Sequence, residues 1–171
     1  MERYQEARCA VFFRTRERWG EFTNFHNGFP ISYEDRVWPS SEALYQALRY
    51  PGDTEVQELI RMATTAKEAK LITYQHISKT RSDWDEVKVG LMEQVVRLKL
   101  DQHKNTFRIL LSQTVDMPIV EKSYGDNFWG AIPDGSGYLN GMNKLGLIWM
   151  LLRAEMVEGV FHADVQLPLA A

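Results

Sequence analysis

Apolar residues recur at helical spacing over much of the chain, and short polar or Gly/Pro-rich stretches separate these segments. The recurrence at i, i+3, i+4 and i+7 predicts helices, whereas short runs of β-branched and aromatic residues predict strands. The predicted helices are Ser40–Arg49, Thr54–Met62, Thr65–Ile72, Asp83–Leu100, Lys104–Gln113 and Leu147–Met156, and the predicted strands are Ala10–Phe13, Met117–Val120 and a hairpin formed by Phe29–Ser32 and Arg36–Trp38.

The remaining segments show neither the helical spacing nor a run of strand-forming residues. Residues 1–9 are polar and predict a loose terminus, 76–82 and 133–137 predict loops, and the tail after Glu158 is irregular. The helix Leu147–Met156 is apolar almost all round, which predicts a central, buried position. At 171 residues the chain is long enough for one domain with a substantial core.

The stretch from Trp38 to Arg49 combines a helix start with a polar face. Pro39 is followed by two serines, either of which can cap the free N–H groups of the helix. Four polar side chains then share one face, and small or branched apolar residues take the other. Such a face is typical of a solvated helix, but it is also what a binding site needs; its members are Glu42, Tyr45, Gln46 and Arg49.

Two lysines interrupt the apolar stripe of the helix Asp83–Leu100. Lys88 and Lys99 project inside the stripe instead of opposite it. An uncompensated buried lysine can have its pKa lowered by ~3–5 units, a large cost against a domain stability of ~5–15 kcal/mol. Each lysine therefore either extends its amine to water or meets an acid.

Two further segments carry candidate chemistry. Arg14, Arg16 and Arg18 alternate with other residues after the first strand, which suits a solvated loop or a rim that holds phosphate. Asp126 lies between Tyr124 and Trp129, with Gly125 and Gly130 allowing a tight backbone. That arrangement fits either a sugar or base pocket or a turn with a packed tryptophan.

Composition narrows the classes of function. The net charge of −3 argues against holding nucleic acid mainly by phosphate neutralisation. Cys9 is the only cysteine, so we expect no intrachain disulfide and no cysteine-based zinc site, and His76 has no partner at ligand spacing. We expect a cytoplasmic protein without a leader peptide, membrane span, metal or cofactor.

The chain resembles the NADAR domains (the YbiA-like proteins) over about residues 11–155. The matching motifs are Thr23-Asn24-Phe25, Trp38-Pro39-Ser40-Ser41-Glu42 with Tyr45-Gln46-Ala47, Arg81-Ser82-Asp83-Trp84 with Lys88, Met92 and Lys99, Val120-Glu121, Asp126-Asn127-Phe128-Trp129-Gly130, Asn143-Lys144-Leu145-Gly146, and Leu152-Arg153. The resemblance implies a mainly α-helical α+β fold with a few short strands, as a single domain over 1–171 with its core at about 10–158. The chain departs from the family pattern at Arg49, where many riboflavin-type members carry lysine.

The resemblance also implies an N-glycosidase, which breaks the bond between ribose C1 and a base. The oxocarbenium-like transition state needs a carboxylate, for which Glu42 and Asp126 are candidates. Lys99 is the candidate amine for an imine at C1, or else it stays protonated and holds an acid. The predicted substrate-binding residues are Arg14, Asn24, Trp38, Tyr45, Gln46, Arg49, Trp84, Lys88, Trp129, Gly130 and Asn143.

Two substrates are associated with the family: ADP-ribose attached to guanine in DNA, removed by antitoxins or repair enzymes, and ribosyl-phosphate pyrimidine intermediates of riboflavin synthesis. The first is favoured because Arg49 departs from the riboflavin-type pattern and because the arginine-rich segment would suit a diphosphate. The expected partners are an ADP-ribosylated nucleic acid or a small ribosylated base, together with a possible toxin. A non-catalytic module that binds ADP-ribose or NAD is the alternative from another class, and the two retained acids argue against it.

Overall fold

The computed structural model describes residues 1–169, and the chain folds into two compact units. The first comprises Met1–Thr23 with Lys104–His162, and the second comprises Asn24–His103 with the C-terminal segment from Ala163. Helices predominate and the strands are short, so the predicted mainly α-helical α+β class is confirmed. None of the helices described within residues 1–169 has the length and apolarity that a membrane crossing requires.

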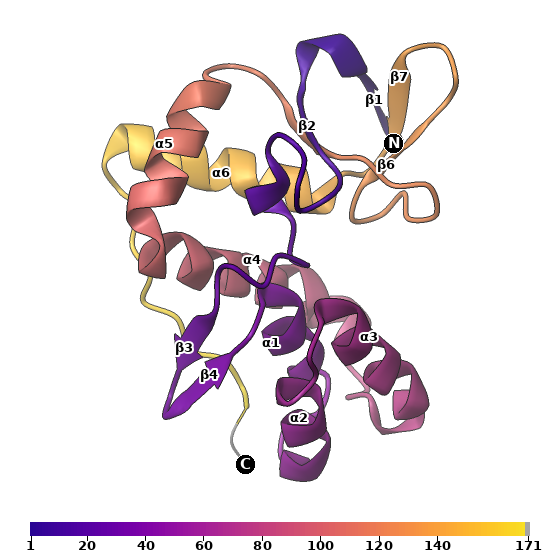
Figure 1. Cartoon of the computed structure of the whole chain (residues 1–171), viewed down its shortest axis with the longest axis vertical. Coiled ribbons are helices and arrows are strands. Elements are labelled where there is room, and N and C mark those ends of the chain that lie inside the picture. The colour runs from indigo at the N-terminus through magenta and orange to yellow at the C-terminus, as the bar shows by residue number, and fades with distance from the viewer. Residues whose placement is uncertain (170–171) are drawn as a thin grey trace. The chain divides into compact units, whose positions relative to one another are not determined.

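The first unit holds two small sheets and two helices, labelled in Figure 1. Its three-stranded antiparallel sheet has the order β1-β7-β6, and β2 pairs in parallel with β5. Helix α6 packs on β5 and against α5. The bounds are β1 Glu2–Gln5, β2 Ala10–Phe12, α5 Lys104–Thr114, β5 Ile119–Glu121, β6 Ala131–Pro133, β7 Tyr138–Gly141 and α6 Lys144–Glu158, with single 3₁₀ turns at Glu6–Arg8 and Gly20–Phe22.

Aromatic packing forms the core of this unit. The ring of Phe22 lies 4.9 Å from that of Trp149 and 6.0 Å from that of Phe12, centroid to centroid. Trp149 also stacks on Phe107, and its indole N–H donates to the Phe22 carbonyl at 3.0 Å. The indole is thus buried with its one donor satisfied, which is the arrangement that a core tryptophan needs.

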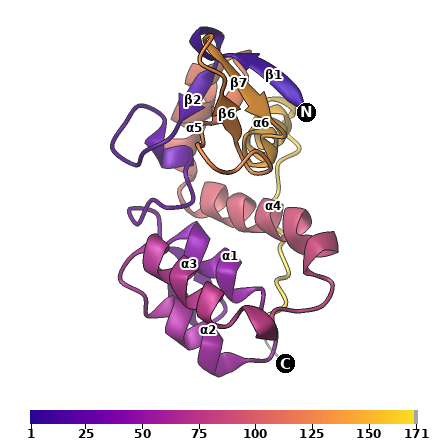
Figure 2. The ribbon, with the colours of Figure 1, turned by 90° about the vertical axis from the view of Figure 1, so that its right-hand side faces the viewer.

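The second unit is a hairpin followed by four helices. Strands β3 and β4 pair antiparallel, and α1 contacts α2, α3 and α4; the packing of α1, α2 and α3 is visible in Figure 2. The C-terminal segment packs here too, since the Tyr33 hydroxyl donates to the Leu167 carbonyl and Gln57 donates to that of Leu169. The bounds are β3 Ile31–Tyr33, β4 Arg36–Trp38, α1 Ser41–Ala47, α2 Thr54–Arg61, α3 Ala66–Gln75 and α4 Trp84–Gln102, with a 3₁₀ turn at Ile77–Lys79.

Some sequence predictions were wrong. The terminus is strand β1 rather than a loose segment, because it pairs with β7, more than 130 residues further along the chain. The hairpin of β6 and β7 was not predicted; its turn, 134–137, falls within the loop predicted at 133–137, and Pro133 belongs to β6. Helix α6 is not buried all round, since Leu147 and Leu151 are 39% and 45% exposed on one face, one turn apart.

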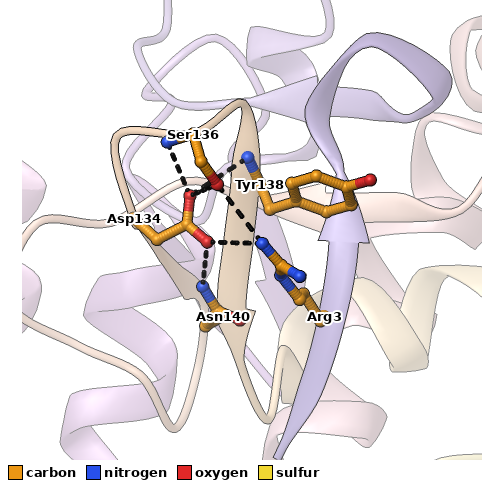
Figure 3. Close-up of polar contacts among 5 residues, drawn as sticks. All are labelled: Arg3, Asp134, Ser136, Tyr138 and Asn140. Atoms are coloured by element: carbon orange, nitrogen blue, oxygen red, sulfur yellow. Dashed lines mark hydrogen bonds and ion pairs between the residues drawn. The ribbon is translucent and has the colours of Figure 1, made fainter.

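The turn between β6 and β7 is organised by Asp134, as Figure 3 shows. One carboxylate oxygen accepts from the Ser136 hydroxyl at 2.6 Å and from the backbone N–H groups of Ser136 and Tyr138. The other accepts from the side chains of Asn140 and Arg3, at 3.1 and 3.2 Å. The Ser136 hydroxyl and backbone, followed by Asn140 and Arg3, hold the pKa of the Asp134 carboxyl far below its usual range.

Asp134→Asn is expected to destabilise the protein at pH 7, because an amide cannot accept the same set of donors. A carboxyl with a depressed folded-state pKa stabilises the fold above its unfolded pKa of about 3.9 and loses that contribution as the pH falls toward the folded-state value. Urea midpoints of wild type and variant should therefore differ most near pH 7 and approach each other below about pH 4. A difference that stays constant from pH 7 to pH 3 would contradict this role.

Candidate active site

Helix α1 begins at a serine cap and carries its polar residues into a buried environment. The Ser40 hydroxyl accepts from the backbone N–H of Ala43 at 3.2 Å. Every residue of Ser41–Ala47 is buried, and Glu42 and Gln46 are only 5% and 4% exposed. The solvated face that the spacing also allowed is therefore excluded. Burying this many polar groups is costly unless they form hydrogen bonds. A buried polar face is a property of binding sites.

A continuous chain of polar contacts runs along this face. The Arg49 Nε–H donates to Gln46 Oε1 at 2.9 Å, and Gln46 Nε2 donates to Glu42 Oε1 at 2.7 Å. The guanidinium of Arg49 lies 4.2 Å from the centroid of Trp84, and the Trp84 ring packs against Tyr45 at 5.1 Å. The predicted set Glu42, Tyr45, Gln46, Arg49 and Trp84 is thus one connected group in the second unit.

Two buried polar side-chain atoms, on residues whose backbones adjoin that of Glu42, have no hydrogen-bond partner within the described residues 1–169. They are Oδ1 of Asn24 and Oγ of Ser41, and both residues are at least 97% buried. The Asn24 backbone carbonyl accepts from the Glu42 N–H at 3.1 Å, and its Nδ2 lies 2.9 Å from the Met92 sulfur. A substrate with hydroxyl or N–H groups would satisfy such atoms, since buried polar groups are normally paired.

Sequence reasoning missed Ser41. It recognised that either serine could cap the helix, but it could not tell which one would. Ser40 takes the cap, and this leaves the Ser41 hydroxyl buried without a hydrogen-bond partner in the part of the chain that the structure describes. The signal was present as the doubled serine before a glutamate.

The two lysines of α4 have different environments. Lys99 is fully buried, and its Nζ lies 5.3 Å from the ring centroid of Phe29. Lys88 is half-buried and forms an ion pair at 2.6 Å with Asp85, one turn earlier, whose side chain is exposed. Lys88 therefore pairs with an acid close to water. The amine of Lys99, by contrast, does not reach water.

Phe29 was not among the predicted site residues. Its ring lies between two histidines, with His26 at 4.9 Å and His103 at 5.2 Å, and the amine of Lys99 lies over it. Phe29 precedes β3 and was interpreted only as part of the hairpin. An aromatic face can stabilise a buried ammonium group, so Phe29 belongs to the surroundings of Lys99.

Trp38 is buried without any exposed surface, and its indole Nε1 has no hydrogen-bond partner among residues 1–169. In this structure it forms part of the interior of the second unit. Any stacking of a base on Trp38 requires its neighbours to move. Trp84, 7% exposed, is the tryptophan of this unit that joins the polar chain through Arg49.

The remaining candidates lie in the first unit, where several also serve the fold. Oδ1 of Asp126 accepts from the backbone N–H groups of Phe128 and Trp129, at 2.9 and 2.8 Å. A Cβ at Gly130 would clash with the carbonyl of Glu121, so Gly130 is required by packing. The structure thus supports the turn interpretation of this segment, with Trp129 half-buried.

Asn143 is fully buried, and both ends of its amide bond to β5. Its Oδ1 accepts from the Glu121 N–H at 3.0 Å, and its Nδ2 donates to the Ile119 carbonyl at 2.9 Å. These bonds join the start of α6 to the strand. They are enough to explain why the sequence has asparagine here, so the substrate contact predicted for it stays a prediction.

The arginine-rich segment 14–18 is at the surface. Arg14 pairs with Glu17 at 3.6 Å, and Arg18 lies 4.6 Å over the ring of Trp19. Arg14, Arg16 and Arg18 are all exposed, as expected for a solvated loop and equally for a phosphate-holding rim.

Glu42 and Lys99 belong to the second unit and Asp126 to the first. Their convergence in one cleft lined by Trp38, Trp84 and Trp129 stays a prediction. Within residues 1–169 the structure has no cluster of three His, Cys, Asp or Glu side chains that could hold a metal.

Comparison with known proteins decides the family. The NADAR domain family model matches residues 11–157. The chain belongs to the NADAR domain family. The motifs that carried the resemblance lie within this match, and the resemblance is confirmed.

Named relatives are similar over most of the chain. N-glycosidase YbiA of Escherichia coli is 32% identical over 145 residues, which cover 85% of this chain and 86% of that protein. An N-glycosidase of Nostoc punctiforme is 33% identical over 147 residues, 85% of this chain and 90% of that protein. A riboflavin biosynthesis protein of Vibrio vulnificus is 34% identical over 156 residues, but these cover 91% of this chain and only 40% of that longer protein.

A solved structure shares the fold. The NMR structure of the Escherichia coli protein YbiA superimposes with a TM-score of 0.72 at 28% identity, covering 92% of this chain and 94% of that one.

Proposed function

We propose that this chain is an N-glycosidase that hydrolyses the bond between ribose C1 and the nitrogen of a base. The observation that carries the proposal is the Glu42 carboxylate, which is 5% exposed and receives a hydrogen bond from Gln46. A buried carboxylate is the group that such a reaction needs. Relatives that match over most of their length are named N-glycosidases, which supports the same reaction class.

In the proposed reaction the C1–N bond breaks with both electrons leaving on the base, and positive charge develops on the sugar. The Glu42 carboxylate stabilises that charge more in the transition state than in the bound substrate. Water then adds its oxygen to C1, and its proton balances the departing base. Asp126 is the second candidate carboxylate of the proposal.

Lys99 supplies the alternative course. A neutral amine attacks C1 of the ring-opened sugar, the base leaves, and water hydrolyses the resulting imine to release sugar and amine. In the other course Lys99 stays protonated and holds a catalytic acid in place. Both courses consume one water and yield one sugar and one base.

For the substrate, we propose ADP-ribose attached to guanine. The three exposed arginines of segment 14–18 support it, because arginine forks suit a diphosphate. The ribosyl-phosphate pyrimidines of riboflavin synthesis are a second candidate, favoured by the name of the Vibrio vulnificus relative. That name describes a protein of which this chain covers 40%, so it supports the riboflavin substrate less directly than the N-glycosidase names support the reaction.

The test supplies wild-type protein with an oligonucleotide carrying ADP-ribosylated guanine and, separately, with the ribosylaminopyrimidine phosphate. Chromatography with mass detection follows free ADP-ribose or ribose phosphate. A kcat/KM at least tenfold higher for the oligonucleotide is the expected result (about 1.4 kcal/mol in transition-state binding). The reverse preference would assign the riboflavin substrate. Tight binding of ADP-ribose with neither reaction would identify a non-catalytic module.

A further inference from the structure

The amide of Gln46 links Arg49 to Glu42. Its Nε–H donates to Gln46 Oε1 at 2.9 Å, and Gln46 Nε2 donates to Glu42 Oε1 at 2.7 Å. Both links follow the turns of α1 and the residues just after it, at i+4 and then i+3. The guanidinium is held on its other side by the ring of Trp84, 4.2 Å away.

The arginine determines which way the amide faces. A glutamine amide has an acceptor end and a donor end, and either orientation is sterically acceptable. Arginine has no acceptor, so only the Gln46 oxygen can face it. The NH₂ end must then face Glu42, where a carboxyl oxygen accepts its hydrogen bond. If the Gln46 amide were rotated by half a turn, its NH₂ group would face the N–H donor of Arg49 and its oxygen would face the Glu42 oxygen. Neither contact would then be a hydrogen bond.

The packing keeps the polar contacts between Arg49, Gln46 and Glu42 in one geometry. Gln46 is 4% exposed, so water does not substitute freely for its partners. Arg49 is half-buried, and the stacked Trp84 packs in turn on Tyr45. A planar group clamped between an aromatic face and an amide loses little entropy on bonding. A lysine ammonium at position 49 would keep the charge but lose the stacked, planar fork.

We infer that Arg49 is a positioning residue, which acts through Gln46 to hold the Glu42 carboxylate aimed at the sugar. The inference rests on the proposed function. It gives Arg49 and Gln46 a different role from substrate binding, which the sequence analysis assigned to both. The two roles make opposite predictions, because a residue that binds phosphate acts on KM, whereas one that positions the carboxylate acts on kcat.

The experiment is a double-mutant cycle in single-turnover and steady-state assays of base release. Arg49→Met is expected to lower kcat about tenfold with KM within about threefold of wild type. Arg49→Lys should recover part of the loss. In the Glu42→Gln background Arg49→Met should cause almost no further loss, because the group on which it acts has lost its charge.

Gln46→Leu tests the middle link and should resemble Arg49→Met in lowering kcat without raising KM. Arg61→Met is the matched control: Arg61 bonds to Glu58 one turn earlier on α2, at the surface, and its loss should leave kcat unchanged. Melting temperatures of all variants separate rate effects from unfolding.

An increase in KM for Arg49→Met that persists, undiminished, in the Glu42→Gln background would overturn the inference and leave Arg49 as a substrate-binding residue. Additive losses of kcat in the cycle would overturn it as well. If wild type releases no base from either substrate, the proposed function fails first and the inference fails with it. If wild type is active, the cycle tests the inference alone.

Discussion

Replacing Glu42 by Gln is expected to lower kcat by ~10²–10³-fold, the effect of losing one preorganised electrostatic contact with the transition state. The change removes the charge and little else. The new amide presents its oxygen toward Gln46 Nε2, so the 2.7 Å hydrogen bond keeps an acceptor. Binding of substrate should therefore stay within a fewfold of wild type, because the carboxylate acts mainly on charge that develops later.

The measurement is steady-state turnover combined with titration of uncleaved substrate against the variant. Glu55→Gln is the matched control, since Glu55 also lies in the first turn of a helix, α2, but is exposed. It should keep wild-type kcat. A folded Glu42→Gln protein with near-wild-type kcat would remove Glu42 from the chemistry and with it the basis of the proposal.

Lys99→Met is expected to lower kcat by at least ~10²-fold, because either course loses an essential group, the nucleophilic amine or the charge that holds an acid. Methionine fills a similar volume in a fully buried position. Turnover of wild type and variant is compared at equal protein concentration. Melting temperatures check that both are folded. Lys67→Met, at an exposed position of α3, is the control and should be fully active.

Borohydride then separates the two courses. If the amine forms an imine, reduction during turnover traps a sugar on the peptide that contains Lys99, and Lys99→Arg is inactive because arginine is a poor nucleophile. If Lys99 only holds an acid, no adduct forms and Lys99→Arg keeps part of the activity. A fully active Lys99→Met protein would exclude both roles.

The first three helices were predictable partly because each begins at a side-chain cap. Ser40 caps α1, and Asp53 and Thr65 cap α2 and α3 through bonds to backbone N–H groups. Such signals act within one turn, so they can be recognised from the sequence alone. Strand β1 could not be predicted in the same way, because four mostly exposed residues form a strand only when β7 arrives beside them.

Local spacing does not determine what covers a helix face. The polar face of α1 has the same period whether water or protein lies over it, so the burial of Glu42 and Gln46 needed the structure. The same limit applies to Leu59 and Ile109, whose helical spacing among apolar residues favours burial, although they are 46% and 60% exposed. Lys99 was predictable as inward-facing because it lies among apolar residues at helical spacing on both sides.

Motif residues proved to be of two kinds. Glu42, Gln46 and Arg49 form a connected polar chain with no evident need in the fold, whereas Asn143 and Gly130 are explained by bonds and packing around β5. A sequence motif does not distinguish these, because both functional and structural requirements fix a residue type. Hydrogen-bond partners do distinguish them.

The most direct test of the central claim is the product balance of wild-type protein with ADP-ribosylated guanine. The proposal predicts one unmodified guanine and one ADP-ribose with a hydroxyl at C1 for each substrate consumed, over many turnovers, with the rate reduced ~10²–10³-fold by Glu42→Gln. Mass spectrometry of both products measures the balance. Saturable binding of ADP-ribose, with neither this substrate nor the ribosylaminopyrimidine phosphate releasing base, would contradict it.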